Sequence, residues 1–126
     1  MPTAFHDRGT AADLAAIMDA HHFDDVVVKP AVSAGSWGTR RVRRTEAEAQ
    51  APYFAALLAE RDVMVQPYLA SVEDYGERSL IFIDGMLTHA IRKSPRFADG
   101  EESVSGPLPI ATDERALAER IIASVD

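Results

Sequence analysis

Lys29 is the side chain whose type and position most directly suggest chemistry. It ends a short run rich in β-branched residues, Asp25–Lys29 (DVVVK), and Pro30 follows it at once. A charged group cannot face a packed core without a partner, so an ammonium at this strand end is well placed to meet phosphate oxygens. The alternative is a lysine that simply extends from the strand end into solvent. Taken alone, these residues favour the second interpretation.

The segment that follows, residues 31–39 (AVSAGSWGT), is rich in small residues and is expected to form a loop. Gly35 and Gly38 allow close approach of the backbone to an anion, and the amides of such a loop can donate to phosphate. No Gly-Lys-Ser/Thr sequence follows them, so the loop is not of the Walker type. Ser36 lacks the context of a hydrolase nucleophile. Trp37 has two open interpretations, packing over a nucleotide or plugging the loop onto the sheet.

Two later segments could bind the rest of a nucleotide. Val63–Leu69 (VMVQPYL) is expected to be a strand followed by extended backbone, which can pair with the edge of an adenine ring. Glu77, in the step Gly-Glu-Arg, could accept hydrogen bonds from ribose hydroxyls. The alternatives are ordinary core positions for Tyr68 and Leu69 and a surface carboxylate for Glu77.

The elements that must position these residues alternate between helices and short strands. A capping box of Thr10 and Asp13 predicts a first helix, and one of Thr45 and Glu48 predicts a second, disturbed at Pro52. The dipeptide Asp84-Gly85 predicts a tight hairpin. The expected strands are 25–29, 39–42, 63–66, 78–83 and 86–93; residues 70–75 and 94–109 are expected to be irregular.

A last helix is expected to begin near Thr112 or Asp113 and to turn Leu117 and Ile121 inward. This order of elements predicts an α+β fold, a mostly antiparallel sheet with helices packed on one face. The length of 126 residues predicts a single domain over 1–126.

The ordered set of VVVKP, a Gly/Ser loop, a helix, VQPYL and GERSLIFIDG with a hairpin ending in IRK resembles the ATP-grasp superfamily. It is most similar to the ligases that include D-alanine–D-alanine ligase and prokaryotic glutathione synthetase. The resemblance covers residues 25–95 well and the flanks loosely. It implies an ATP-grasp-type half-fold, the nucleotide-binding part of a longer domain.

The resemblance also implies roles for individual residues. Lys29 matches the lysine that contacts the nucleotide phosphates, and Glu77 matches the acidic residue that binds the ribose. Arg92 and Lys93 lie where basic residues often face the phosphates or the substrate. The flexible phosphate loop corresponds to Ser33, Gly35, Ser36 and Gly38, and the adenine-holding segment to Gln66, Pro67, Tyr68 and Leu69. The family usually has Glu where Gln66 stands, but an amide can still accept from the adenine amino group.

The implied function is ATP-dependent ligation of a small-molecule carboxylate to an amine or thiol through an acylphosphate. The family also binds Mg²⁺ through acidic residues on later strands. In this chain Asp113, Glu114 and Glu119 fall on a predicted helix and are interpreted as surface residues, so no metal ligand or catalytic residue is assigned. Whether this chain alone is an enzyme stays open. The alternative is an inactive binding or structural module that self-associates.

Composition excludes several other classes of function. The net charge of −7 argues against nucleic-acid binding, and no apolar run approaches the ~20 residues of a membrane span. The sequence lacks cysteine, which excludes disulfides and thiolate metal sites and suits a cytoplasmic protein. Arg40, Arg41, Arg43 and Arg44 are expected to form a solvated positive face balanced by acidic helices. The histidines lack metal-ligand spacing; His89 could line a cleft, although a structural role is expected.

Overall fold

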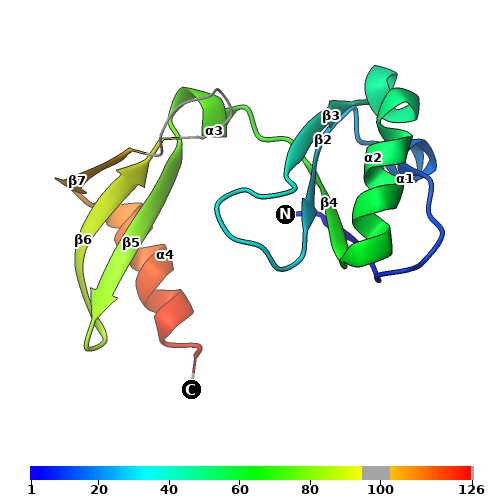
Figure 1. Ribbon diagram of the computed structural model, residues 1–126. Coiled ribbons are helices and arrows are strands. Elements are labelled where there is room, and N and C mark those ends of the chain that lie inside the picture. The colour runs from blue at the N-terminus through cyan, green and yellow to red at the C-terminus, as the bar shows by residue number, and fades with distance from the viewer. Residues whose placement is uncertain (95–102, 126) are drawn as a thin grey trace. The chain divides into compact units, whose positions relative to one another are not determined.

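The computed structural model describes residues 1–94 and 103–125, and for residues 73 and 74 it describes the backbone alone. The chain divides into two compact units, Met1–Tyr68 and Leu69–Asp126 (Figure 1). Each unit is α+β with one antiparallel sheet, which confirms the predicted fold class, although two sheets replace the one expected. The single domain over 1–126 stays a prediction, because a compact unit is defined by contacts and a domain by independent folding.

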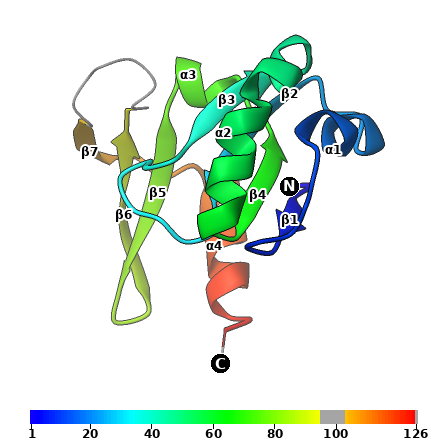
Figure 2. The ribbon, with the colours of Figure 1, turned by 45° about the vertical axis from the view of Figure 1, so that its right-hand side comes forward.

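The first unit is a four-stranded antiparallel sheet with two helices on one face (Figure 1). The strand order is β1-β4-β2-β3, so β2 and β4 are the central strands. Figure 2 shows α2 lying across this sheet. The elements are β1 (Ala4–His6), α1 (Leu14–Ala20), β2 (Asp25–Pro30), β3 (Arg40–Arg43), the 3₁₀ turn η1 (Arg44–Glu46), α2 (Ala47–Glu60) and β4 (Val63–Pro67).

Alternation along the central strands explains why only one sheet face is packed. Val26 and Val28 on β2, with Val63 and Val65 on β4, are fully buried, whereas the residues between them are only half-buried. Successive strand side chains point to opposite faces, so the valines form the face that meets the helices. They join one core cluster with the helix residues Leu14, Met18, Phe54 and Leu58.

Both predicted capping boxes are wrong. The first helix is capped by Asp13, whose Oδ1 accepts from the Ala16 amide at 2.8 Å. The α-helical part of the second helix begins at Ala47, after the 3₁₀ turn, and it is unbroken through Pro52. Pro52 is exposed, so the carbonyl that its missing N–H would have bonded can be hydrated instead.

The second unit contains a three-stranded antiparallel sheet with the strand order β5-β6-β7. Asp84 and Gly85 both have positive φ, 50° and 76°, which confirms the predicted tight hairpin between β5 and β6. Residues 94–109 were expected to be irregular, but part of this stretch forms a strand, β7, that was not predicted. Pro95 and Gly100 of the same stretch lie outside the described residues. The elements are α3 (Ser71–Asp74), β5 (Glu77–Ile83), β6 (Met86–Lys93), β7 (Val104–Leu108) and α4 (Thr112–Ile122).

The burial expected for Leu117 and Ile121 of the last helix is wrong. Leu117 and Ile121 are 51% and 53% exposed, and the buried position of α4 is Ala118. One turn earlier, Glu114 pairs with Arg78 of β5 at 2.5 Å. Residues 114 and 118 lie on the same helical stripe and contact the sheet, whereas Leu117 and Ile121, on the same side of the helix, stay exposed. No helix in the described ranges is long and apolar enough to cross a membrane.

Candidate functional site

The helix-free side of the four-stranded sheet brings Lys29 and Gln66 onto one surface. Lys29 pairs with Met64, and Val27 with Gln66, across the β2–β4 ladder. Residues opposite each other in such a ladder share a face, and Phe5, paired with Met64, joins them from β1. We call these five side chains the open face. Lys29 is two residues, or ~7 Å along the strand, from the level of Gln66. The Lys29 ammonium has no hydrogen bond or ion pair to any described residue.

The predicted adenine segment continues directly from the open face. The Gln66 Nε2 donates to Thr3 Oγ1 at 2.8 Å, which leaves the Gln66 carbonyl oxygen as the group able to accept from a ligand. The Tyr68 amide donates to the Asp25 carbonyl at 2.8 Å and keeps the backbone extended past Pro67. Leu69 is exposed and begins the second unit, so it is not a core residue. The division between the units therefore falls inside this segment.

Arg41 is a residue of this region whose role was not predicted. It forms an ion pair with Asp25 at 2.7 Å, and its guanidinium lies 3.5 Å from the centre of the Tyr68 ring. The arginine run was expected to be a solvated face balanced by acidic helices. In agreement with this, the exposed Arg40 donates to Gln50 at 2.8 Å, and Arg44 pairs with Asp19 of α1 at 2.6 Å. Sequence spacing carried no signal for these partners, because Asp25 is sixteen positions from Arg41.

The small-residue loop is fixed at its base and open at its tip. Gly38 has a φ of 66°, and a Cβ there would lie 3.1 Å from the Pro30 ring. The Tyr53 hydroxyl donates to the Gly38 carbonyl at 2.7 Å. Burial raises the pKa of the Tyr53 hydroxyl above its ordinary value, so this donor stays protonated. The amides of residues 33–36 make no hydrogen bond within the described part of the chain, which leaves them able to bind an anion.

Trp37 does not plug the loop onto the sheet. Its side chain is 54% exposed, and its ring centre lies 5.6 Å from the Arg61 guanidinium at the end of α2. A hydrophobic plug would be buried in the core, so that interpretation is wrong. Packing over a nucleotide remains as the functional interpretation.

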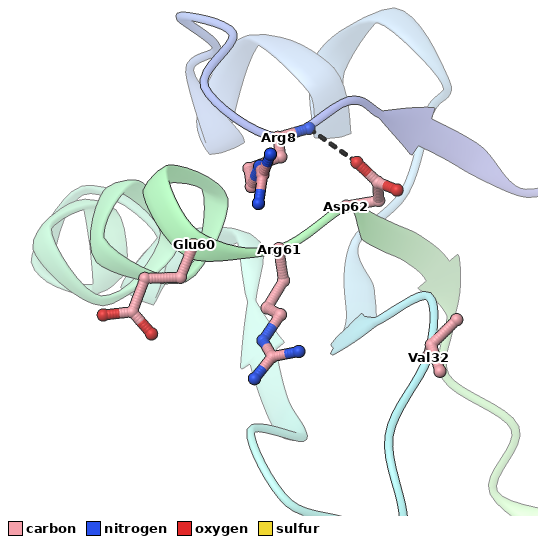
Figure 3. A pocket seen from close by; sticks show the side chains of 5 residues that line it. All are labelled: Arg8, Val32, Glu60, Arg61 and Asp62. Carbon is pink, nitrogen blue, oxygen red and sulfur yellow. Dashed lines mark hydrogen bonds between the residues drawn. The ribbon is translucent and has the colours of Figure 1, made fainter.

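Beside the loop, a pocket of about 260 Å³ was not predicted. It is lined by Arg8, Val32, Glu60, Arg61 and Asp62, and the Arg8 amide donates to Asp62 Oδ1 at 2.7 Å (Figure 3). Figure 3 shows the Glu60 and Arg61 side chains diverging from the end of α2. With two arginines and two carboxylates among its lining residues, the pocket favours neither anions nor cations.

The second unit has an open sheet face of its own. Glu77 pairs with Lys93 across the β5–β6 ladder, and Ile81 pairs with His89 further along it. These side chains share the face opposite Arg78, the residue that holds α4. The structure thus brings Glu77 and Lys93 together, whereas Arg92 pairs with Arg78 on the other face and lies 5.3 Å from the Tyr75 ring.

The acidic residues considered for magnesium do not form a site. Glu114 is paired with Arg78, and Glu119 with Arg115 at 3.4 Å. Among the described residues, no group of three or more His, Cys, Asp or Glu side chains is arranged to hold a metal ion. Asp113 is exposed in the first turn of α4.

Comparison with known proteins gives two similarities and no match to any protein-family model. The cycloserine biosynthesis protein DcsG of Streptomyces lavendulae is 42% identical over 81 residues, which cover 64% of this chain and 26% of that protein. The crystal structure of D-cycloserine synthetase DcsG superposes with a TM-score of 0.76 at 32% identity, over 97% of this chain and 44% of that one. The chain is therefore similar in sequence and fold to a biosynthetic synthetase, and it spans less than half the length of that protein.

Proposed function

We propose that this chain is the ATP-binding portion of an ATP-grasp ligase that joins a carboxylate to an amine or thiol through an acylphosphate. The observation that carries the proposal is the open face: an ammonium and an amide carbonyl, neither with a partner among the described residues, lie on adjacent strands, beside a loop whose amides are unbonded in the same part of the chain. The similarity to a synthetase supports a ligase-type reaction. We also propose a cytoplasmic location, which suits a chain without cysteine.

The residues divide by the part of ATP that they would contact. Lys29 and the loop amides neutralise the phosphates, and Glu77 accepts from the ribose hydroxyls. Lys93, on the same face as Glu77, and Arg92 supply further positive charge. The loop residues in this assignment are Ser33, Gly35, Ser36 and Gly38, and the adenine residues are Gln66, Pro67, Tyr68 and Leu69.

In the proposed reaction, the γ-phosphoryl group passes to a carboxylate oxygen, and a nucleophile then displaces phosphate from the acylphosphate. Such transfers depend on positioning and on stabilisation of the phosphate charge, and Lys29 and the loop amides would supply both. ATP-grasp ligases also use Mg²⁺, but the described residues do not fit such an ion. We therefore assign no metal ligand and route no step through one.

A second candidate function is an inactive module that self-associates. It is favoured by the exposed apolar side chains of α4, which include Leu117, Ile121 and Ile122. Exposed apolar surface of this kind promotes association in water.

The chain has only two lysines, Lys29 and Lys93, which allows a direct test. We expect ATP to bind the wild-type chain in calorimetric titrations with and without Mg²⁺. We expect Lys29→Ala to weaken binding at least about tenfold, since a charged hydrogen bond contributes ~1.5 kcal/mol or more. Arg120→Ala, an exposed cation on α4, is the matched control and leaves binding unchanged.

Lysine acetylation mapped by mass spectrometry gives an independent reading, because bound ATP is expected to protect Lys29. Equal affinity of wild type and Lys29→Ala, with no protection, would contradict the assignment. If the wild-type chain binds no ATP and its mass in solution rises with concentration, the self-associating module is the better description.

A further inference from the structure

Asp25 fixes the Arg41 side chain through a two-pronged ion pair. The Arg41 Nε donates to both carboxylate oxygens at 3.1 Å, and Nη2 donates to Oδ2 at 2.7 Å. Each side chain is only 28% exposed, so solvent screens the pair less than it screens a pair at the open surface. A forked contact of this kind determines the orientation of the guanidinium as well as its position.

The Arg41 guanidinium lies over the ring of Tyr68. The guanidinium carbon is 3.5 Å from the centre of that ring, well within the range of a cation–π contact. The Tyr68 amide donates to the Asp25 carbonyl at 2.8 Å, so Asp25 holds both Arg41 and Tyr68. We call these three residues, which all belong to the first unit, the Arg41 cluster.

Strand register places the Arg41 cluster at the border of the open face. Arg41 of β3 pairs with Val27 of β2, and Gln66 of β4 pairs with Val27 from the other side. Residues opposite each other in a ladder share a face of the sheet, so Val27 lies between Arg41 and Gln66. One step beyond the last pair of the β2–β4 ladder, Tyr68 lies opposite Asp25. The cluster therefore adjoins the segment that we assign to adenine.

The charge of Arg41 is already matched within the protein. Asp25 compensates it, and Tyr68 covers one side of the guanidinium. A phosphate bound at Arg41 would lie beside the Asp25 carboxylate, and close charges of the same sign repel each other. The Lys29 ammonium, on the same sheet face, has no ion pair to any described residue. The two cations thus differ: Lys29 is available to an anion, whereas Arg41 is engaged by the protein.

The end of the adenine segment depends on Tyr68. Pro67 has no N–H to donate to a ladder, and the first unit ends at Tyr68. The Tyr68 amide is therefore the last backbone donor of this segment within the first unit. Because Arg41 contacts the ring of the same residue, it restrains the side chain whose backbone keeps residues 66–68 extended.

We propose that Arg41 is a positioning residue for the nucleotide base: through Tyr68, it holds residues 66–68 in the extended form that pairs with the edge of the base. The inference rests on the proposed function, and it assigns Arg41 to the base end of the nucleotide rather than to the phosphates. Without Arg41, the Tyr68 side chain would have to be ordered when a base binds. Ordering one side chain corresponds to a loss of affinity of about threefold to tenfold.

The test compares ATP with inorganic tripolyphosphate, which has the phosphates without the base, by calorimetric titration of the whole chain. Arg41→Ala is expected to weaken ATP binding about threefold to tenfold and to leave tripolyphosphate binding unchanged. Arg41→Lys keeps the charge but loses the planar fork, so we expect it to lose as much ATP affinity. Arg43→Ala, on the same strand, is the matched control: its side chain is 61% exposed, and both affinities should be unchanged.

A measurement without any ligand reports the same restraint. Hydrogen exchange of the Tyr68 amide is expected to be faster in Arg41→Ala and Arg41→Lys than in the wild-type chain, and unchanged in Arg43→Ala. Asp25→Asn removes the negative charge but keeps the shape of the side chain, so it should give the same pattern as Arg41→Ala. It serves as the second variant if Arg41→Ala unfolds, and amide spectra show which variants keep the fold.

Equal ATP affinity in the wild-type chain and Arg41→Ala would overturn the role of Arg41 alone, as would full recovery of affinity in Arg41→Lys. An equal loss for ATP and tripolyphosphate would also overturn it, because Arg41 would then act on the phosphates. Unchanged exchange of the Tyr68 amide in both Arg41 variants would contradict the restraint itself. If the wild-type chain binds no ATP, the nucleotide assignment fails, and the role of Arg41 fails with it.

Discussion

The two units bury apolar side chains to very different extents. The contiguous core cluster lies wholly in the first unit, from Ala4 to Val65. In the described part of the second unit, the buried apolar residues are Ala90 and Ala118, both small. Burial of large apolar side chains is the main source of folding free energy. We therefore expect the first unit to be more stable to unfolding than the second.

The second unit relies more on polar connections. Arg78 pairs with Glu114 and also donates to the Pro109 carbonyl and to the Tyr75 hydroxyl. Hydrogen bonding to Tyr75, followed by that to Glu114, raises the pKa of the Arg78 guanidinium above its ordinary value. This guanidinium therefore stays charged and holds α4 through directional contacts, where the first unit uses packing.

The two units should differ most in the free energy of unfolding that is lost when one large apolar residue of each unit is truncated. Phe54→Ala is expected to lower the free energy of unfolding of the first unit by about 3–5 kcal/mol, because Phe54 is fully buried. Leu80→Ala, at a half-buried position of β5, should cost below ~2 kcal/mol. Urea unfolding, followed by Trp37 fluorescence and by amide hydrogen exchange in each unit, measures both. Equal losses would break the comparison.

N-terminal helix capping should also stabilise the first unit more than the second. Asp13→Ala removes the side-chain cap of α1 and should destabilise the first unit by about 1 kcal/mol. The N-cap of α4 is Ala111, which has extended backbone and no side-chain acceptor. Ala111→Ser is therefore expected to stabilise α4 by ~0.5–1 kcal/mol. Slower exchange of α4 amides in this variant would sharpen the comparison; faster exchange would contradict it.

The ion pair of α4 should contribute a smaller amount. Glu114→Ala is expected to cost below ~1 kcal/mol, since its side chain and that of Arg78 are still partly exposed. Glu119→Ala, which removes a more exposed pair with Arg115, is the control and should be nearly neutral. Hydrogen exchange in α4 distinguishes the two. If hydrogen exchange in α4 is unchanged in both variants, polar contacts do not hold this helix.

The smallest effect expected is a dependence on pH confined to the first unit. The hydrogen bond from Arg44 lowers the pKa of the Asp19 carboxyl. A depressed folded-state pKa contributes stability above the unfolded-state value, about 3.9, and the contribution disappears as pH falls through the folded-state pKa. Asp19→Asn should therefore be slightly less stable than wild type at neutral pH and equal to it in acid. A difference that persists in acid would refute this origin.

Most strands could be predicted from sequence, because local signals specify them. The β-branched run before Pro30 and the Asp84-Gly85 turn locate β2 and the β5–β6 hairpin. β7 was missed because Gly106 and Pro107 are typical of loops. The placement of Lys29 and Gln66 on one face follows from strand register, which local patterns do not provide.

Local patterns did not predict which side chains of a face become buried or paired. Leu117 and Ile121 share a helix face with Glu114 and Ala118, yet Ala118 is the buried residue of α4 and Glu114 pairs with Arg78. Arg41 belongs to an arginine run that reads as solvated, yet its partner is Asp25 on the neighbouring strand. Charged side chains find partners that are distant in sequence, so hydrophobic periodicity alone misassigns them.

The hydrogen bond from Tyr53 to the Gly38 carbonyl has a consequence for affinity without any contact to a ligand. Tyr53 belongs to α2, on the packed side of the sheet, while the loop that it restrains carries the unbonded amides. A loop held at its base has fewer conformations to lose when an anion orders it, so its preorganisation favours binding. If the loop binds a nucleotide as proposed, substitutions in the helix layer would change its affinity through loop entropy and leave every ligand-contacting group unchanged.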